Sequence, residues 1–255
     1  MNKDRIFIKM ALQPVPIVLA IAWGLSHFIS YPTLAQATRN TQRRPAQTLP
    51  PPPQTPPPNQ RKPGGGLDAS KSACKDTSKP LTALIPVQNP VLATSEHPTF
   101  LFYVPYRSDE VEVGEFSLLV WPDEKKRIYK TSFTLPQTPG IVSITLPSSP
   151  EYALVENQYY HWYVKLYCKG NTSNKPDLDL NGWVQRVALT PERERQIKDA
   201  TPEVWYDALA NLANRLSTSP QDATLRSKWV NLLKSIGSED LAQEPFVGSV
   251  MPRER

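Results

Sequence analysis

Proline constrains this chain more than any other residue type, because it is abundant and concentrated in one short stretch. The sequence has 255 residues and 28 prolines, with runs at Pro50–Pro53 and Pro56–Pro58. No apolar periodicity is visible between residues 37 and 67, and Gly64–Gly66 follows the prolines. Such a stretch buries too little apolar surface to offset the entropy lost on ordering it. We therefore predict a disordered, basic, Pro/Gly-rich linker over residues 38–73.

The proline runs also predict how this linker would behave. Proline favours the extended polyproline helix, which rises about 3.1 Å per residue, so the linker would act as a spacer. A simple spacer is the interpretation we favour. The alternative is that its cationic ends contact anionic envelope polymers or a partner that recognises proline.

The N-terminus has the pattern of an export signal over residues 1–37. A basic start precedes an apolar core at residues 17–25, and small residues fit signal-peptidase cleavage after Ala35 or Ala37. The apolar stretch at 17–29 is shorter than the roughly 20 residues that cross a bilayer. We therefore expect cleavage; an uncleaved anchor, which alone would attach the chain to a membrane, is the alternative. Either way, the rest of the chain would be extracytoplasmic, in the periplasm or secreted.

The formal charge of +5 is divided unevenly along the chain. Residues 1–80 carry +8, which leaves −3 for residues 81–255. The basic character therefore belongs to the signal and linker. Nucleic-acid binding needs a basic face on the folded part, so we exclude that class of partner.

From Leu81 onward, short apolar runs alternate with turn residues. Valine, isoleucine, threonine and aromatic residues dominate these runs, as is typical of strands. About seven such strands without helical periods between them favour an antiparallel, immunoglobulin-like β-sandwich, which we place at residues 74–190. The predicted strands are 81–87, 99–104, 115–121, 128–135, 141–146, 159–168 and 183–189.

A helical segment over residues 191–246 is predicted to follow the sandwich. Capping hydroxyls precede prolines at Thr190-Pro191, Thr201-Pro202 and Ser219-Pro220. Apolar stripes at residues 204–216 and 225–236 predict a helical hairpin that packs on the sandwich. A hairpin that serves as an assembly face for a partner is the alternative. Residues 247–255 are predicted to be a disordered tail.

The two cysteines, Cys74 and Cys168, are predicted to form a disulfide, because an even pair in an oxidising compartment usually does. The bridge would close a loop of about 95 residues and contribute roughly 4 kcal/mol in the entropic model. A redox-active role is poorly supported, since the pair is not vicinal.

The predicted strand at 159–168 has two distinct faces. Its even-numbered residues form a core face with a tryptophan. The other face carries Lys165 and the four residues that we name as a candidate binding surface: Tyr159, His161, Tyr163 and Tyr167. We favour an explanation in which the helical segment packs over this face or the tyrosines pair across strands. The alternative is a flat aromatic platform for a sugar ring or a peptide.

Motifs for catalysis are absent from the sequence. It has no nucleophile elbow, phosphate loop, dinucleotide fingerprint or His-Glu-x-x-His pattern, and its few histidines and cysteines do not have metal-ligand spacing. We therefore predict no catalytic residue, cofactor or metal. The alternative is an envelope hydrolase or transferase with His97 or His161 as base; His97 stands two residues after Ser95.

Six stretches of the chain resemble a cyanobacterial family, the domain of unknown function 928. They are residues 79–86, 95–106, 139–142, 182–187, 205–209 and 239–245, which read KPLTALIP, SEHPTFLFYVPY, PGIV, GWVQRV, WYDAL and EDLAQEP. The resemblance spans about Cys74 to Phe246. It implies exported proteins with a variable linker and no established activity, so no catalytic residues carry over. It also supports the disulfide, since family members have cysteines at both positions.

Together these features predict an exported, non-enzymatic binding or interaction protein of the envelope, displayed on a Pro-rich spacer. Its partner would be an envelope glycan or another exported protein. The sequence leaves the oligomeric state open.

Overall fold

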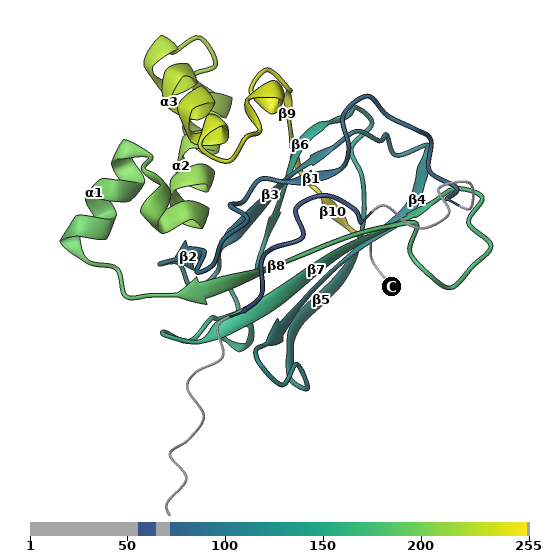
Figure 1. Cartoon of the computed structure of the whole chain (residues 1–255), viewed down its shortest axis with the longest axis horizontal. Helices are drawn as coiled ribbons and strands as arrows, with labels where there is room; N and C mark the ends of the chain where they lie inside the picture. The colour runs from purple at the N-terminus through teal and green to yellow at the C-terminus, as the bar shows by residue number, and fades with distance from the viewer. Residues whose placement is uncertain (1–55, 65–71, 254–255) are drawn as a thin grey trace, which may run out of the picture. The chain divides into compact units, whose positions relative to one another are not determined.

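The apolar runs after Leu81 form two β-sheets, with three α-helices grouped at one end (Figure 1). The computed structural model describes residues 56–64 and 72–253. The predicted signal peptide and the linker residues 38–55 and 65–71 lie outside the described residues. No helix in the described part of the chain is long and apolar enough to span a membrane.

Within the described chain, eight strands precede the helical segment, and two short strands follow it. They are β1 (Thr82–Ala83), β2 (Leu92–Ala93), β3 (Thr99–Val104), β4 (Val111–Val120), β5 (Arg127–Thr134), β6 (Gly140–Thr145), β7 (Tyr159–Cys168), β8 (Leu178–Arg186), β9 (Phe246–Ser249) and β10 (Met251–Pro252). One sheet has the order β1-β3-β6-β9, and the other has the order β10-β5-β4-β7-β8-β2. The fold is therefore mainly β, as the sequence predicted.

The expectation of a purely antiparallel fold is wrong, because β2 pairs with β8 and β9 pairs with β6 in parallel. Neither pair is joined by a hairpin, so no tight turn forces the strands to run in opposite directions. The tail after residue 246, predicted to be disordered, supplies β9 and β10. Val250 lies between these two strands and is buried, which gives this segment an apolar anchor.

The two sheets contact each other through aromatic rings. Phe100 of β3 lies 5.1 Å from Phe116 of β4, and Phe102 lies 5.4 Å from Trp162 of β7, measured between ring centroids. Trp162 is fully buried. The predicted core face of β7 is thus confirmed: Tyr160, Trp162, Val164, Leu166 and Cys168 are all buried.

The helices are α1 (Pro191–Asp199), α2 (Trp205–Thr218) and α3 (Ala223–Lys234). The Thr190 side chain caps α1 as predicted, but Thr201-Pro202 opens a short 3₁₀ turn ahead of α2. The cap of α3 is Asp222, whose carboxylate accepts from the N–H groups of the first turn, and not the predicted Ser219. A carboxylate is favoured there because the helix dipole is positive at that end.

Tyr206 of α2 ties the helices to strands β7 and β8. Its hydroxyl accepts a hydrogen bond from Trp162 Nε1 (2.8 Å) and donates one to the carbonyl of Trp183 in β8 (2.9 Å). The neighbouring Trp205 Nε1 donates to the carbonyl of Leu84 (2.7 Å). These indole and phenol groups are buried, so each needs its partner.

Residues 56–64 belong to the predicted disordered linker, yet they lie on the folded part. The Asn59 side chain is buried and accepts a hydrogen bond from Trp183 N (2.8 Å), and Gln60 forms an antiparallel bridge with Asn181. The Arg61 guanidinium donates to the carbonyl of Ile236 (2.7 Å), just after α3. Polar side chains hold this segment, so a search for apolar periodicity could not find it.

The predicted disulfide between Cys74 and Cys168 is confirmed, and it fastens the chain before β1 to the end of β7. Asp177 supports the bridge, because its carboxylate accepts from the backbone N–H groups of Ala73 (2.8 Å) and Cys168 (2.9 Å).

Removal of one buried hydroxyl tests whether Tyr206 holds the helices on the sheet. We expect Tyr206→Phe to lower the free energy of unfolding by about 2–3 kcal/mol, because it leaves a buried indole N–H and a buried carbonyl without partners. Urea denaturation of the oxidised chain measures this difference. The matched control is Tyr167→Phe on the half-exposed face of β7, where we expect a change below about 0.5 kcal/mol. Equal effects of the two substitutions would contradict this account.

Candidate binding surface

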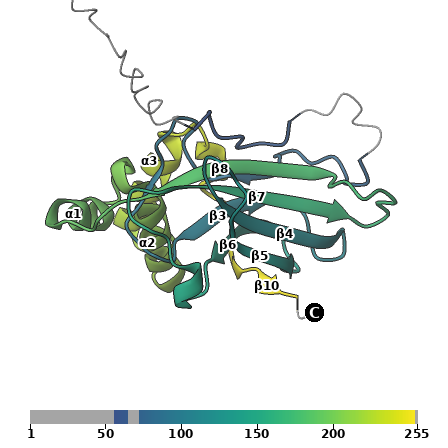
Figure 2. The same cartoon turned by 90° about the horizontal axis from the view of Figure 1, so that it is seen from below.

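The helices leave the outer face of the six-stranded sheet uncovered (Figure 2), and only Asn59 and Gln60 lie against its β8 side within the described residues. Figure 2 shows β5, β4, β7 and β8 side by side, with the helices grouped beyond one end of the strands. Helix α2 packs against β2 and β3. The expectation that the helical segment covers the odd-numbered face of β7 is therefore wrong, because the helices bury their apolar stripes at the end of the two sheets.

The four candidate residues do not share one environment. Tyr159, Tyr163 and Tyr167 are half-buried, whereas His161 is only 6% exposed. The tyrosines have cross-strand neighbours, as the second half of the favoured explanation expected, but none of these neighbours is aromatic. Their cross-strand neighbours on β4 and β8 are Gln185 for Tyr159, Ser117 and Asn181 for Tyr163, and Val113 for Tyr167.

His161 lies inside an aromatic cluster that the sequence analysis missed. Its ring stacks on Trp183, with centroids 4.0 Å apart and planes 13° from parallel. Trp121 stands perpendicular to Trp183 at 5.9 Å, an edge-to-face arrangement that aromatic quadrupoles favour. The Tyr163 ring lies 4.2 Å from His161 on the other side. The register of β7 against β8 creates this cluster, since it places Trp183 directly opposite His161.

Glu124 fixes the polar groups of the cluster. One carboxylate oxygen lies 2.5 Å from His161 Nδ1, and the other accepts from the Tyr163 hydroxyl at 3.0 Å. His161 Nε2 lies 3.1 Å from Asn181 Oδ1, so both ring nitrogens face oxygen atoms. Burial and the nearby Glu124 carboxylate both raise the pKa of Tyr163, so its phenol remains a neutral donor.

The backbone at Glu124 shows that this carboxylate is held in place. Glu124 has a φ of 52°, in the left-handed region that residues other than glycine and asparagine rarely occupy. Such a conformation costs on the order of 1 kcal/mol and persists where the surroundings stabilise it. Here the side chain makes two contacts across the sheet. The β4–β5 turn and the β7 ladder therefore form one fixed unit.

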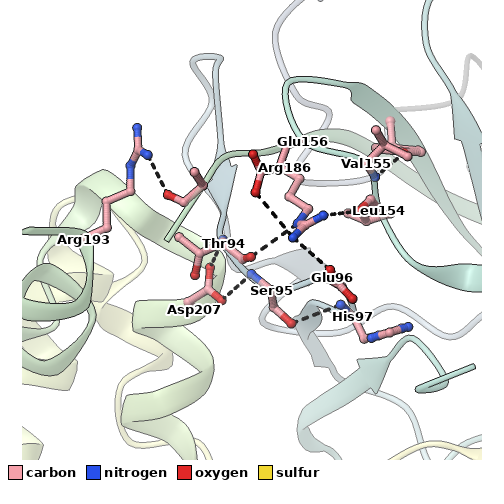
Figure 3. Close-up of polar contacts among 12 residues, drawn as sticks. Thr94, Ser95, Glu96, His97, Leu154, Val155, Glu156, Arg186, Arg193 and Asp207 are labelled. Carbon is pink, nitrogen blue, oxygen red and sulfur yellow. Dashed lines mark hydrogen bonds and ion pairs between the residues drawn. The ribbon is translucent and has the colours of Figure 1, made fainter. Parts of the chain in front are cut away.

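The two candidate bases differ from a catalytic histidine in their contacts. His161 is buried with both nitrogens engaged. His97 Nε2 lies 3.1 Å from the carbonyl of Ser149, and the backbone N–H of His97 donates to Ser95 Oγ (3.0 Å). Figure 3 shows the His97 ring turned away from Ser95. Within the described residues, neither ring has the hydrogen bond to a serine that a nucleophile–base pair requires.

The Asp207 carboxylate lies beside Ser95 and binds backbone N–H groups. It accepts from the N–H groups of Thr94 (2.7 Å) and Ser95 (3.1 Å), which fastens α2 to the end of β2 (Figure 3). Arg186 braces the same corner by donating to the carbonyl of Leu154 (2.7 Å) and pairing with Glu96 (3.0 Å). These contacts are structural, because they hold α2, β2 and β8 together at this corner.

One group in the described residues has the proximity of metal ligands: Cys74, Cys168 and Asp177. The two sulfur atoms are bonded to each other. The Asp177 carboxylate already accepts hydrogen bonds from Ala73, Cys168 and Asn171. We therefore assign this group to the disulfide anchor.

The buried Asp207 predicts a pH effect on stability. Burial raises the pKa of this carboxyl, although hydrogen bonds from Thr94 and Ser95 partly oppose the shift. The folded chain therefore binds a proton more tightly than the unfolded chain, so this group's contribution to stability is lost as pH rises from about 4 through the folded-state pKa. We expect wild type to lose stability relative to Asp207→Asn over that window in urea denaturation. Parallel pH profiles for the two proteins would contradict the prediction.

Comparison with known proteins places the chain in one family. No curated protein and no solved structure matches it. The family model described as Domain of Unknown Function (DUF928) matches residues 63–246, a range that contains β1–β8 and all three α-helices. The candidate binding surface and both cysteines lie within that match. The chain therefore belongs to the DUF928 family.

Proposed function

We propose that this chain is an exported, non-enzymatic binding protein of the cyanobacterial envelope, and that it binds through the outer face of its six-stranded sheet. The observation that carries the proposal is the network of Glu124, His161 and Tyr163. The network fixes the Tyr163 ring on this uncovered face. Glu124, which anchors the network, has a left-handed backbone conformation. Preorganised aromatic rings lower the entropy cost of binding.

The composition of this face favours an uncharged ring-bearing ligand. Tyr163 and Tyr167 are half-exposed and lie on the same side of β7, two pleats apart. The charges beside them are balanced: Lys130 pairs with Glu115 (3.4 Å), and Lys165 lies opposite Asp179. An aromatic face whose neighbouring charges balance suits an uncharged sugar ring, so we favour an envelope glycan over an exported protein segment.

The architecture is consistent with an immunoglobulin-like display domain. The order β1-β3-β6 corresponds to strands A-B-E of that fold, and β5-β4-β7-β8 corresponds to C′-C-F-G. We propose this kinship from strand order alone. The parallel strands β2 and β9 are additions to that scheme.

The disulfide supports the extracytoplasmic location that we propose, because such bonds persist in oxidising compartments. A cleaved signal at Ala35 or Ala37 and a Pro-rich spacer would then place the domain at a distance from its attachment.

Sedimentation with envelope fractions tests the proposal. We expect the oxidised full chain to pellet with isolated peptidoglycan sacculi and not with outer-membrane vesicles. Tyr163→Ala should weaken retention about tenfold, the effect of an aromatic hot-spot residue. Tyr163→Phe, which keeps the ring and removes the hydroxyl contacts to Glu124 and His161, should have a smaller effect.

Tyr152→Ala is the matched control, because Tyr152 contacts Tyr129 at the rim of the sheets and lies off this face. Pelleting with neither fraction would contradict a glycan ligand and favour a protein partner. Unchanged retention of both Tyr163→Ala and Tyr167→Ala would remove the outer face from the account.

A further inference from the structure

A groove lies on the helical side of the molecule, away from the outer sheet face. It has a volume of about 300 Å³, at the small end of the range for ligand pockets. Helices α2 and α3 and the segment that leads into β9 form its walls. Its apolar lining is Leu216, Pro220, Trp229, Ala242, Pro245 and Phe246. The Trp229 ring is buried (2% exposed) and lies 4.9 Å from the half-buried Phe246 ring, so Phe246 supplies the accessible aromatic surface of the groove.

Arg226 gives this apolar groove a positive charge. Its Nε donates to the carbonyl of Pro220 (2.7 Å), and within the described residues its two terminal nitrogens have no acceptor. The one acid in the lining, Glu244, is already paired with Lys79. The N–H groups at the start of α3 are already bound by the Asp222 carboxylate, so Arg226 is the cationic group that the groove offers to an anion. The groove therefore complements an anionic group attached to an apolar body.

A second hollow lies next to the first groove. It has a volume of about 210 Å³ and shares Ser217 and Phe246 with the first groove. Its walls are one side of α2, including Ala210 and Ala213, and strands β3, β6 and β9. A ligand that extends past Phe246 would enter this hollow, which favours a linear body over a compact ring.

We propose that this groove binds a medium-chain aliphatic carboxylate. The carboxylate pairs with the free nitrogens of Arg226, a geometry that permits two parallel hydrogen bonds. The alkyl chain lies on Phe246 and on the exposed rings of Pro220 and Pro245, and continues toward the hollow between α2 and the strands. This site is separate from the proposed glycan surface, so either proposal can fail alone.

Isothermal titration of the oxidised full chain with hexanoate, octanoate and decanoate tests the site. Burial of each added methylene should raise affinity about fourfold, so each two-carbon step should give a rise of about an order of magnitude. Arg226→Gln should weaken all three ligands about tenfold and leave the increment between them unchanged. Arg226→Lys, which keeps the charge and loses the paired hydrogen bonds, should fall between wild type and Arg226→Gln.

Two further variants separate this site from general adsorption. Ala210→Leu narrows the second hollow and should weaken decanoate several-fold with little effect on hexanoate. Arg195→Gln removes an exposed charge on α1 and should change nothing. Absence of binding at millimolar ligand, or equal binding by wild type and both Arg226 variants with native circular dichroism, would overturn the proposal.

Discussion

The hydroxyl of Tyr206 is the contact on which the rest of the structure depends. It lies fully buried where α2 meets the sheet, accepts from Trp162 on β7 and donates to the backbone of Trp183 on β8. Trp162 contacts the opposite sheet through Phe102, while the Trp183 ring stacks on His161 at the outer face. One phenol therefore connects the helices, the core and the candidate binding surface. Because α2 docks at the end of the sheets through this contact, the outer face stays uncovered.

The outer face is also joined to the end of the proline-rich segment. A chain of side-chain contacts runs from Glu124 through His161 and Asn181 to Gln60, with 3.1 Å between Asn181 Nδ2 and Gln60 Oε1. Gln60 follows the last proline run by two residues, and its neighbour Asn59 is buried against β8. The segment thus meets the domain at the border of the candidate surface.

Local patterns in the sequence predicted the elements well, whereas long-range register decided the site. Alternation in residues 159–168 identified both faces of β7, and the export pattern with two cysteines predicted the disulfide. Trp121, Glu124 and Trp183 were missed because the first two lie in the β4–β5 turn and the third in β8, and only the pairing of β7 with β4 and β8 brings them to His161. The docking of Asn59 and the parallel strand β9 were missed for a related reason. Both depend on hydrogen bonds to distant backbone, which leave no periodic signal in the chain.

The most direct test of the central claim, that the outer sheet face binds an envelope glycan, is to locate a bound ligand by NMR. Amide shifts of the oxidised full chain would be followed while solubilised sacculus fragments are added. The account predicts saturable shifts at Tyr163, Lys165 and Tyr167 and at their neighbours on β4 and β8, with little change in the helices. Shifts confined to the helical groove, or no saturable shifts at all, would contradict it.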